Sequence, residues 1–101
     1  MTAWKKFDPE KEFAVVTEEL WQYVYNRDGG MCQAAKKGCN KSGSQAHHIR
    51  YRSGCGKHKA SNLIMLCVNC HHREHNIEPL GEACYLSRAE KNEKKFKSRL
   101  V

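Results

Sequence analysis

Residues 46–75 read AHHIRYRSGCGKHKASNLIMLCVNCHHREH, and this stretch decides the fold. Two short apolar islands, Ala46 to Tyr51 and Asn62 to Cys67, are joined by a loop that contains glycine and lysine. This pattern predicts a β-hairpin. The residues that follow Val68, NCHHREHN, predict a short helix, which a proline ends by Glu78.

The segment before the hairpin, residues 1–28, is predicted to be helical. Asp8-Pro9 offers an N-cap and a first helical position, and Thr17 can cap a second stretch whose apolar residues recur at helical spacing. A glycine pair then ends this stretch. We expect these helices to support the domain rather than to carry chemistry.

The segment after the hairpin is predicted to end in a basic helix. Ser87-x-x-Glu90 is a capping box, and the helix that it opens runs toward Leu100. A chain of 101 residues accommodates one domain. We expect helical support over residues 1–28, a metal-binding core over residues 29–78 and the basic helix within residues 79–101.

The formal net charge of +7 is concentrated in the middle of the chain. Residues 29–75 hold eight basic groups and one acidic group, and all six histidines lie in the same segment. Such a charge favours a polyanion with a phosphate backbone as the partner, although a solvated basic face is the simpler alternative. No stretch approaches the roughly 20 apolar residues of a membrane helix. The N-terminus lacks a signal-peptide core, so we expect a cytoplasmic protein without a membrane partner.

The cysteines predict a structural zinc site. Cys67-x-x-Cys70 has the spacing that lets two thiolates bind one tetrahedral ion, and Cys32-x6-Cys39 is a looser pair upstream. A thioredoxin-like redox role for CVNC would need a βαβ setting that the sequence does not show. Two further cysteines either compete for membership of the zinc site or pack as small apolar residues, Cys55 and Cys84.

The histidines predict a second site. His71 and His75 stand four residues apart, so on a helix they share a face and can chelate one cation. His47 and His48 are neighbours in the first island, where strand alternation points them to opposite faces, so we expect two different roles. Asn62 opens the second island, where its amide can bridge backbone groups of the preceding loop.

Taken in order, these motifs resemble the HNH endonuclease family. They are Cys-x6-Cys, then Ala-His-His-Ile, then Asn-Leu-Ile-x-Leu-Cys-x-x-Cys-His, then a histidine four positions on, and they cover residues 32–75. The resemblance implies an α+β fold, the small ββα-metal module. In that module a two-stranded antiparallel hairpin precedes a helix, here stapled by zinc and flanked by N- and C-terminal helices.

The resemblance also implies residue roles. His48 is the general base, and Asn62 holds the loop that orients it. This sequence has histidine at position 47, where aspartate is frequent in the family. The resemblance assigns no role to His72. The implied ligands of the catalytic cation are His47, His71 and His75.

These features together predict a metal-dependent DNA endonuclease of low sequence specificity. The 5′-phosphate and 3′-hydroxyl products are expected from the family. A neutral His48 takes the proton of the attacking water, and imidazole ligands favour Mn²⁺ over the harder Mg²⁺, with Ni²⁺ also suited. A monomer nicks duplex DNA, whereas a homodimer with paired sites would break both strands. The basic residues expected to hold phosphates are Arg50, Arg52, Lys57, Lys59 and Arg73.

Two other classes compete with the endonuclease. A non-catalytic zinc ribbon that binds nucleic acid explains the cysteines and the charge, but it leaves the histidines and Asn62 without a role. A zinc-stabilised protein-interaction module explains even less. The resemblance further implies a bacterial or phage-infected cell, where free-standing modules of this kind assist genome packaging or restriction.

Overall fold

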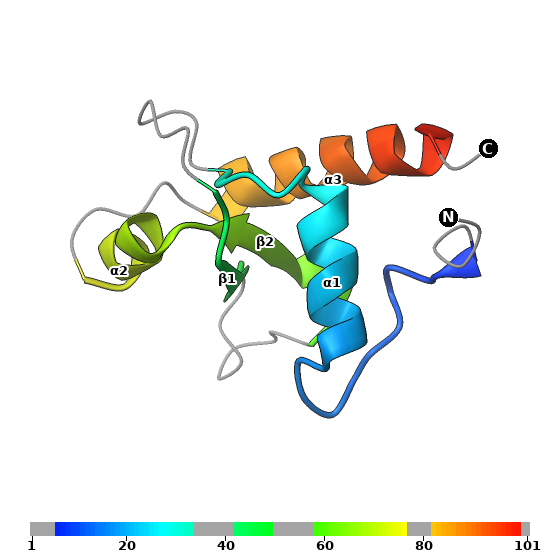
Figure 1. Ribbon diagram of the computed structural model, residues 1–101, viewed down its shortest axis with the longest axis horizontal. Coiled ribbons are helices and arrows are strands. Elements are labelled where there is room, and N and C mark those ends of the chain that lie inside the picture. The colour runs from blue at the N-terminus through cyan, green and yellow to red at the C-terminus, as the bar shows by residue number, and fades with distance from the viewer. Residues whose placement is uncertain (1–5, 34–41, 50–57, 77–81, 100–101) are drawn as a thin grey trace.

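The computed structural model describes residues 6–33, 42–49, 58–76 and 82–99. Two antiparallel strands form one sheet, and helices surround it (Figure 1). The α+β class predicted from the sequence is therefore confirmed. None of the helices in these four ranges is long and apolar enough to cross a membrane. In chain order the elements are α1 (Glu18–Arg27), β1 (Gln45–His48), the 3-10 helix η3 (Ala60–Asn62), β2 (Leu63–Leu66), α2 (Val68–Asn76) and α3 (Glu82–Arg99).

The predicted hairpin is confirmed, with strands shorter than the apolar islands. β1 pairs with β2 so that His47 lies opposite Ile64 and His48 lies opposite Leu63. Because side chains alternate along a strand, this register sends the two histidines to opposite faces of the sheet. β2 is buried along its whole length, since helices cover both of its faces.

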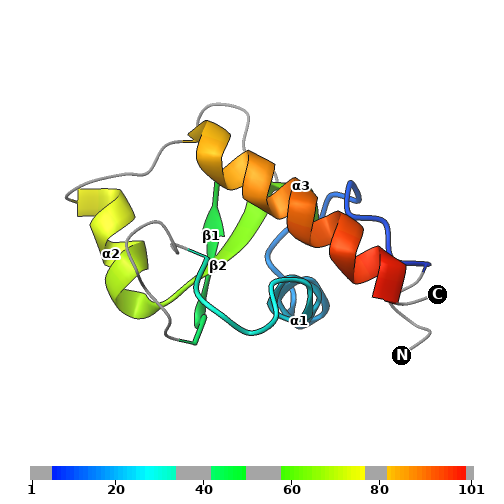
Figure 2. The ribbon, with the colours of Figure 1, turned by 90° about the horizontal axis from the view of Figure 1, so that it is seen from above.

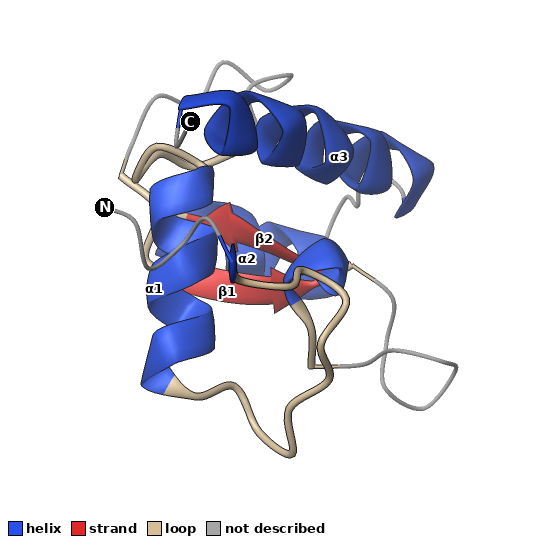
Figure 3. Cartoon of the chain, turned by 90° about the vertical axis from the view of Figure 1, so that its right-hand side faces the viewer, coloured by secondary structure: helices blue, strands red, loops and turns tan. Residues whose placement is uncertain are grey.

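The two faces of the sheet belong to two apolar clusters. Ile64 and Leu66 pack on the side of α2 and of the first turns of α3, together with Tyr85. Leu63 and Met65 pack on the side of α1. Figure 2 shows α2 and α1 on opposite sides of the hairpin, with α3 running from beside the strands toward α1, and Figure 3 shows α3 above the strands. The hairpin is thus held between the helices at its two faces, which fixes where its histidines point.

The predicted helix start at Asp8-Pro9 is wrong, because residues 7–17 contain no α-helix. The Asp8 carboxylate instead accepts a hydrogen bond from the Glu10 backbone N–H at 2.9 Å. Aspartate commonly folds back on its own backbone in this way, and the result is a turn. Phe7 then stacks on Tyr23 of α1, with ring centroids 4.0 Å apart. Packing against α1, rather than helical hydrogen bonding, therefore holds this segment in position.

The predicted boundaries of α1 are confirmed. Leu20 donates its backbone N–H to the Thr17 hydroxyl at 3.1 Å, which is the expected N-cap hydrogen bond. After the helix, Gly29 and Gly30 adopt φ angles of +68° and +70°. Residues with a Cβ rarely adopt this left-handed conformation, so the glycine pair ends the helix.

The helix α3 begins at Glu82, five residues before the predicted capping box. Ser87 therefore lies exposed inside the helix rather than at its start. Tyr85 and Ala89 are both buried against the first apolar cluster, and their spacing of four places them on one helical face. The burial of this upstream face outweighs the local capping signal.

A buried ion pair joins α1 to the rest of the fold. The Arg27 Nε donates to the Asp28 carboxylate at 2.9 Å, and the other guanidinium nitrogens donate to the Ala60 and Leu63 carbonyls at 2.6 Å each. Asp28 also accepts from the Met65 backbone N–H at 2.9 Å. These hydrogen bonds tie the end of α1 to η3 and β2, the two elements that follow His58 in the chain.

A second polar contact joins α1 to α3. The Tyr23 hydroxyl donates to the Glu93 carboxylate, and Glu93 lies 3.9 Å from the Arg27 guanidinium. Burial, together with the neighbouring Glu93 carboxylate, raises the pKa of the Tyr23 hydroxyl above its ordinary value. The hydroxyl therefore stays protonated and donates throughout the physiological pH range.

The change Tyr23→Phe should lower the free energy of unfolding by about 1.5–3 kcal/mol, the typical value of a hydrogen bond to a charged group. The physical reason is that Glu93 keeps its partly buried charge and loses one donor. Tyr25→Phe is the matched control, since it removes the same hydroxyl from the half-buried Tyr25 on the same helix. Urea unfolding measures both. An equal loss in the two variants would contradict the role given to the Tyr23–Glu93 contact.

Candidate active site and metal centres

Three cysteines converge at one edge of the hairpin. Cys67 follows β2 directly, Cys70 lies in the first turn of α2, and Cys32 follows α1 after the glycine pair. All three are buried, and their sulfur atoms lie within 4.8 Å of one another. The Cys70 backbone N–H also points at the Cys67 sulfur, at 3.4 Å. Residues far apart in the sequence thus form one compact donor cluster.

This cluster fits a structural metal ion. Sulfur ligands at about 2.3 Å from a tetrahedral zinc ion lie about 3.8 Å apart, so only small side-chain shifts separate the observed cluster from a zinc site. The N–H of Cys70 would stabilise a thiolate at Cys67. Cys39, the fourth predicted ligand, lies outside the described residues. Cys84 is half-buried in α3 and is not part of the cluster of described donors.

The hairpin places His47 beside α2. His47 is 4% exposed, and its ring lies 5.3 Å from the ring of His71 at an interplanar angle of 76°. The Tyr85 ring of α3 also contacts His47, with ring centroids 6.0 Å apart. One histidine from the strand and one from the helix therefore lie side by side.

His48 points to the other face of the hairpin, where it meets a histidine that sequence reasoning missed. The Nε2 atom of His48 lies 2.9 Å from the Nδ1 atom of His58, which is hydrogen-bond distance. His58 stands ten residues further along, at the far end of the hairpin loop. No periodicity links the two positions, and His58 lies outside both strands, where it forms a β-bridge with Phe13 of the N-terminal segment.

Asn62 closes the loop between the two strands. Its backbone carbonyl accepts a hydrogen bond from the Ile49 N–H at 2.8 Å, and its own N–H donates to the Lys59 carbonyl at 2.9 Å. The residue is 4% exposed. Asn62 thus joins the residue that follows His48 to the segment that carries His58.

A comparison with family models identifies this region. The model described as HNH endonuclease matches residues 32–77. Residues 32–77 form an HNH endonuclease domain. The matched range contains the cysteine cluster, the hairpin and α2. Members of this family are phosphodiesterases that hydrolyse nucleic acids. No curated protein and no solved structure matches the chain.

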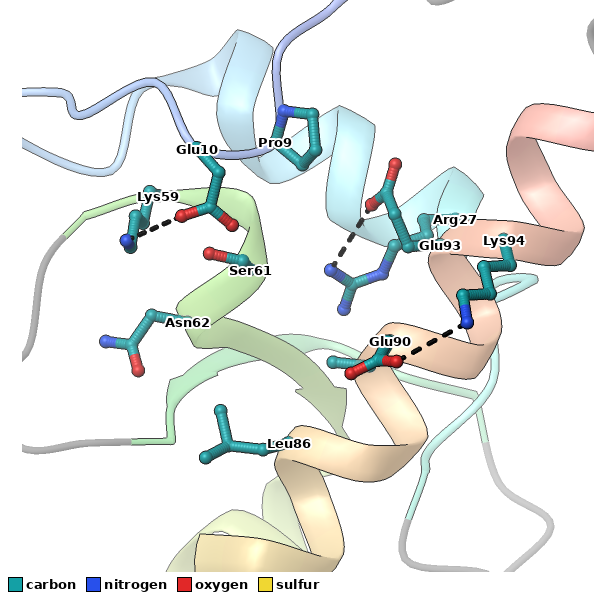
Figure 4. Close-up of a pocket in the computed structure, with 11 residues that line it drawn as sticks. Pro9, Glu10, Arg27, Lys59, Ser61, Asn62, Leu86, Glu90, Glu93 and Lys94 are labelled. Atoms are coloured by element: carbon teal, nitrogen blue, oxygen red, sulfur yellow. Dashed lines mark hydrogen bonds and ion pairs between the residues drawn. The ribbon is translucent and has the colours of Figure 1, made fainter.

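Outside the HNH domain, α1, α3 and residues 6–17 complete the fold. α3 and the N-terminal segment line a pocket of about 510 Å³ beside η3 (Figure 4). Of the predicted catalytic residues, Asn62 lines this pocket, whereas His47, His48 and His71 do not. This pocket is therefore not the site of these three histidines. We assign the candidate active site from the histidine geometry instead.

The structure describes few of the predicted phosphate contacts. Lys59 is described, and its ammonium group lies 2.7 Å from the Glu10 carboxylate. This ion pair connects Lys59 to the N-terminal segment and leaves its predicted role in phosphate binding untested. The other predicted phosphate contacts lie outside the described residues, either entirely or in their side chains: Arg50, Arg52, Lys57 and Arg73. The side chain of the predicted ligand His75 also lies outside them.

Proposed function

We propose that this protein is a metal-dependent DNA endonuclease in which His48 is the general base. The observation that carries the proposal is the division of the histidine pair by the hairpin of an HNH domain. His47 meets His71 on one face, and His48 meets His58 on the other. One pair suits cation binding and the other suits proton transfer, and phosphodiester hydrolysis needs both functions.

His48 has the chemistry that a general base requires. With an ordinary pKa near 6.5, a histidine is largely neutral at about pH 7 and can accept a proton from water. His48 is half-buried, so it keeps contact with solvent. Taking the proton of a water molecule as that water attacks phosphorus is the step we assign to it.

The neighbouring rings of His47 and His71, which lie edge to face, fit a divalent cation of intermediate hardness. Imidazole nitrogens suit Mn²⁺, Ni²⁺ or Zn²⁺ better than Mg²⁺, and a third imidazole from His75 is proposed to complete the set. When bound, such a cation would supply positive charge near the phosphoryl oxygens and the leaving 3′ oxygen. The burial of His47 and its edge-to-face contacts with the His71 and Tyr85 rings keep its ring in one orientation.

We propose that the cysteine cluster holds a second, structural zinc ion, with Cys39 as its fourth ligand. Cys67 and Cys70 lie at the start of the helix that carries His71. The His71 backbone N–H donates to the Cys67 carbonyl at 2.9 Å. A metal ion at the cysteines would therefore fix the helix on which the catalytic ligands stand.

Charge supports DNA as the substrate. The segment from residue 29 to residue 75 holds eight basic groups and one acidic group. Counterion release from the phosphate backbone would supply most of the binding free energy, so added salt should weaken cleavage by weakening binding. One active site cuts one strand, so we propose nicking with low sequence specificity and 5′-phosphate ends. A homodimer would be needed for cleavage of both strands.

The test is an assay of the zinc-loaded full chain on supercoiled plasmid. We expect nicked circles with Mn²⁺, slower nicking with Mg²⁺ and no nicking when a chelator is added together with the plasmid. Retardation of the plasmid on a gel without any nicking, in all of these cations, would reject the endonuclease and support the zinc ribbon. Linear product formed at the same rate as nicked product would indicate paired active sites.

A further inference from the structure

We propose that His58 is a positioning residue for His48, and that the N-terminal segment outside the HNH domain holds His58 in place. The proposal rests on the function proposed above, since it concerns the group that accepts the proton. It assigns to residues before the HNH domain a part in the geometry of its active site.

The contact, taken together with the proposed role of His48 as a base, indicates which nitrogen of His48 is basic. His48 Nε2 and His58 Nδ1 are 2.9 Å apart, and the two rings are inclined at 67°, so they share a hydrogen bond rather than stack. One nitrogen of each neutral imidazole carries a proton. A donor at His48 Nε2 leaves a lone pair at His48 Nδ1, which can accept the proton of water. The reverse arrangement would leave His48 with no basic nitrogen outside this hydrogen bond.

His58 is therefore assigned the acceptor role through Nδ1, with its own proton on Nε2. In this state His58 fixes both the ring orientation and the tautomer of His48. Comparable partners of metal-bound or catalytic histidines are usually carboxylates or backbone carbonyls. Here the partner is a second imidazole, which is a weaker acceptor than a carboxylate and leaves the ring pair without a fixed negative charge.

The N-terminal segment holds His58 through its backbone. The Phe13 N–H donates to the His58 carbonyl at 2.9 Å, and the Ser61 N–H donates to the Pro9 carbonyl at 3.0 Å. These two hydrogen bonds lie on either side of the Lys59–Glu10 ion pair, which Figure 4 shows with Ser61 close by. The segment from residue 58 to residue 61 is thus fixed at three places by residues 9–13.

Side-chain charge supports the same attachment. The ammonium group of Lys59, through its hydrogen bond, and then the hydroxyl of Ser61 lower the pKa of the Glu10 carboxyl below its ordinary value. Glu10 is therefore ionised at neutral pH, where the ion pair is formed. Phe13 itself packs against the apolar cluster on the α1 face, so the segment that holds His58 is anchored in the core.

The first test compares His58→Ala with His58→Asn in steady-state cleavage by the full chain. The amide of asparagine reaches the place of an imidazole Nδ1 and can accept the hydrogen bond from His48. We expect kcat to fall at least about tenfold in the alanine variant with KM unchanged, and to be largely restored by asparagine. Equal kcat in His58→Ala and the parent would overturn the proposal, and so would an asparagine variant as slow as the alanine variant.

The second test does not require cleavage. Nitrogen-15 NMR of the zinc-loaded protein, at a pH well above 7 where the rings are neutral, reports which nitrogen of each histidine carries the proton. We expect the proton on Nε2 of His48 in the parent and a mixture of tautomers in His58→Ala. A proton on Nδ1 of His48 in the parent would overturn the proposal. If the parent does not cleave DNA at all, the proposed function fails, and this measurement still decides the role of His58.

Discussion

Replacing Cys70 by Ser should leave the domain unfolded at room temperature, so that heating shows no cooperative unfolding transition. Cys70 is one of three buried cysteines whose sulfur atoms lie within 4.8 Å of one another. Structural zinc contributes on the order of 10–16 kcal/mol of folding free energy, and a whole domain is stable by only about 5–15 kcal/mol. Loss of one of the proposed thiolate ligands would remove much of this contribution and leave a polar hydroxyl within the apolar cluster.

The matched control is Cys84→Ser, which makes the same chemical change on a half-buried helix position outside the cluster. We expect this variant to melt like the parent and to retain its zinc. Circular dichroism during heating, together with the zinc content of the purified protein, measures both properties. A Cys70→Ser variant with a parental melting curve would show that the cysteine cluster does not hold the fold together.

The same pair of measurements identifies the fourth ligand. If Cys39 binds the ion, Cys39→Ser should lose zinc as Cys70→Ser does. The described donors already exclude Cys84 from the cluster as it stands. Retention of zinc in Cys39→Ser would transfer the fourth position to another residue, with Cys55 the next cysteine to replace.

Local signals were sufficient to predict the centre of the fold. Two apolar islands joined by a loop with glycine and lysine predicted the hairpin, and the alternation of side chains along a strand predicted that His47 and His48 lie on opposite faces, in agreement with the pairing of β1 with β2. The CxxC motif predicted the cysteine pair because four residues at a helix start bring two sulfurs together. In these cases the chemistry depends on residues that are close in sequence.

Predictions failed or were missing where distant packing decides the structure. The N-terminal turn at Asp8 forms instead of a helix because the segment packs on Tyr23 and pairs with the loop after β1. α3 starts early because Tyr85 is buried against the hairpin. His58 had no local signal, since it lies ten positions from His48 and is held by a backbone bridge to Phe13 of the N-terminal segment. The contact of Cys32 with the CxxC pair is an exception, because it is also distant in sequence but was predicted from the spacing of the cysteines.

The replacement of His48 by Ala should lower the rate of DNA cleavage by about 10²- to 10⁴-fold, the usual contribution of a general base. Alanine cannot accept a proton from water, whereas His47 and His71 would still be present to bind a cation. The β1–β2 backbone pairing does not need the imidazole, and His48 is only half-buried. The variant is therefore expected to keep its zinc, its melting curve and its affinity for duplex DNA.

His72→Ala provides the matched control for this change. His72 lies exposed on α2, next to the proposed ligand His71, and has no assigned part in the reaction. The two variants lose the same side chain from the same domain. A general loss of activity caused by removing one of several histidines would slow both variants equally. Loss of the general base would slow only His48→Ala.

The most direct test is therefore the single-turnover rate of plasmid nicking with Mn²⁺ for the parent, His48→Ala and His72→Ala, all at saturating protein. The account predicts parental nicking by His72→Ala and at least about a hundredfold slower nicking by a folded, DNA-binding His48→Ala. A folded His48→Ala variant that nicks the plasmid at the parental rate would contradict the assignment of His48 as the general base.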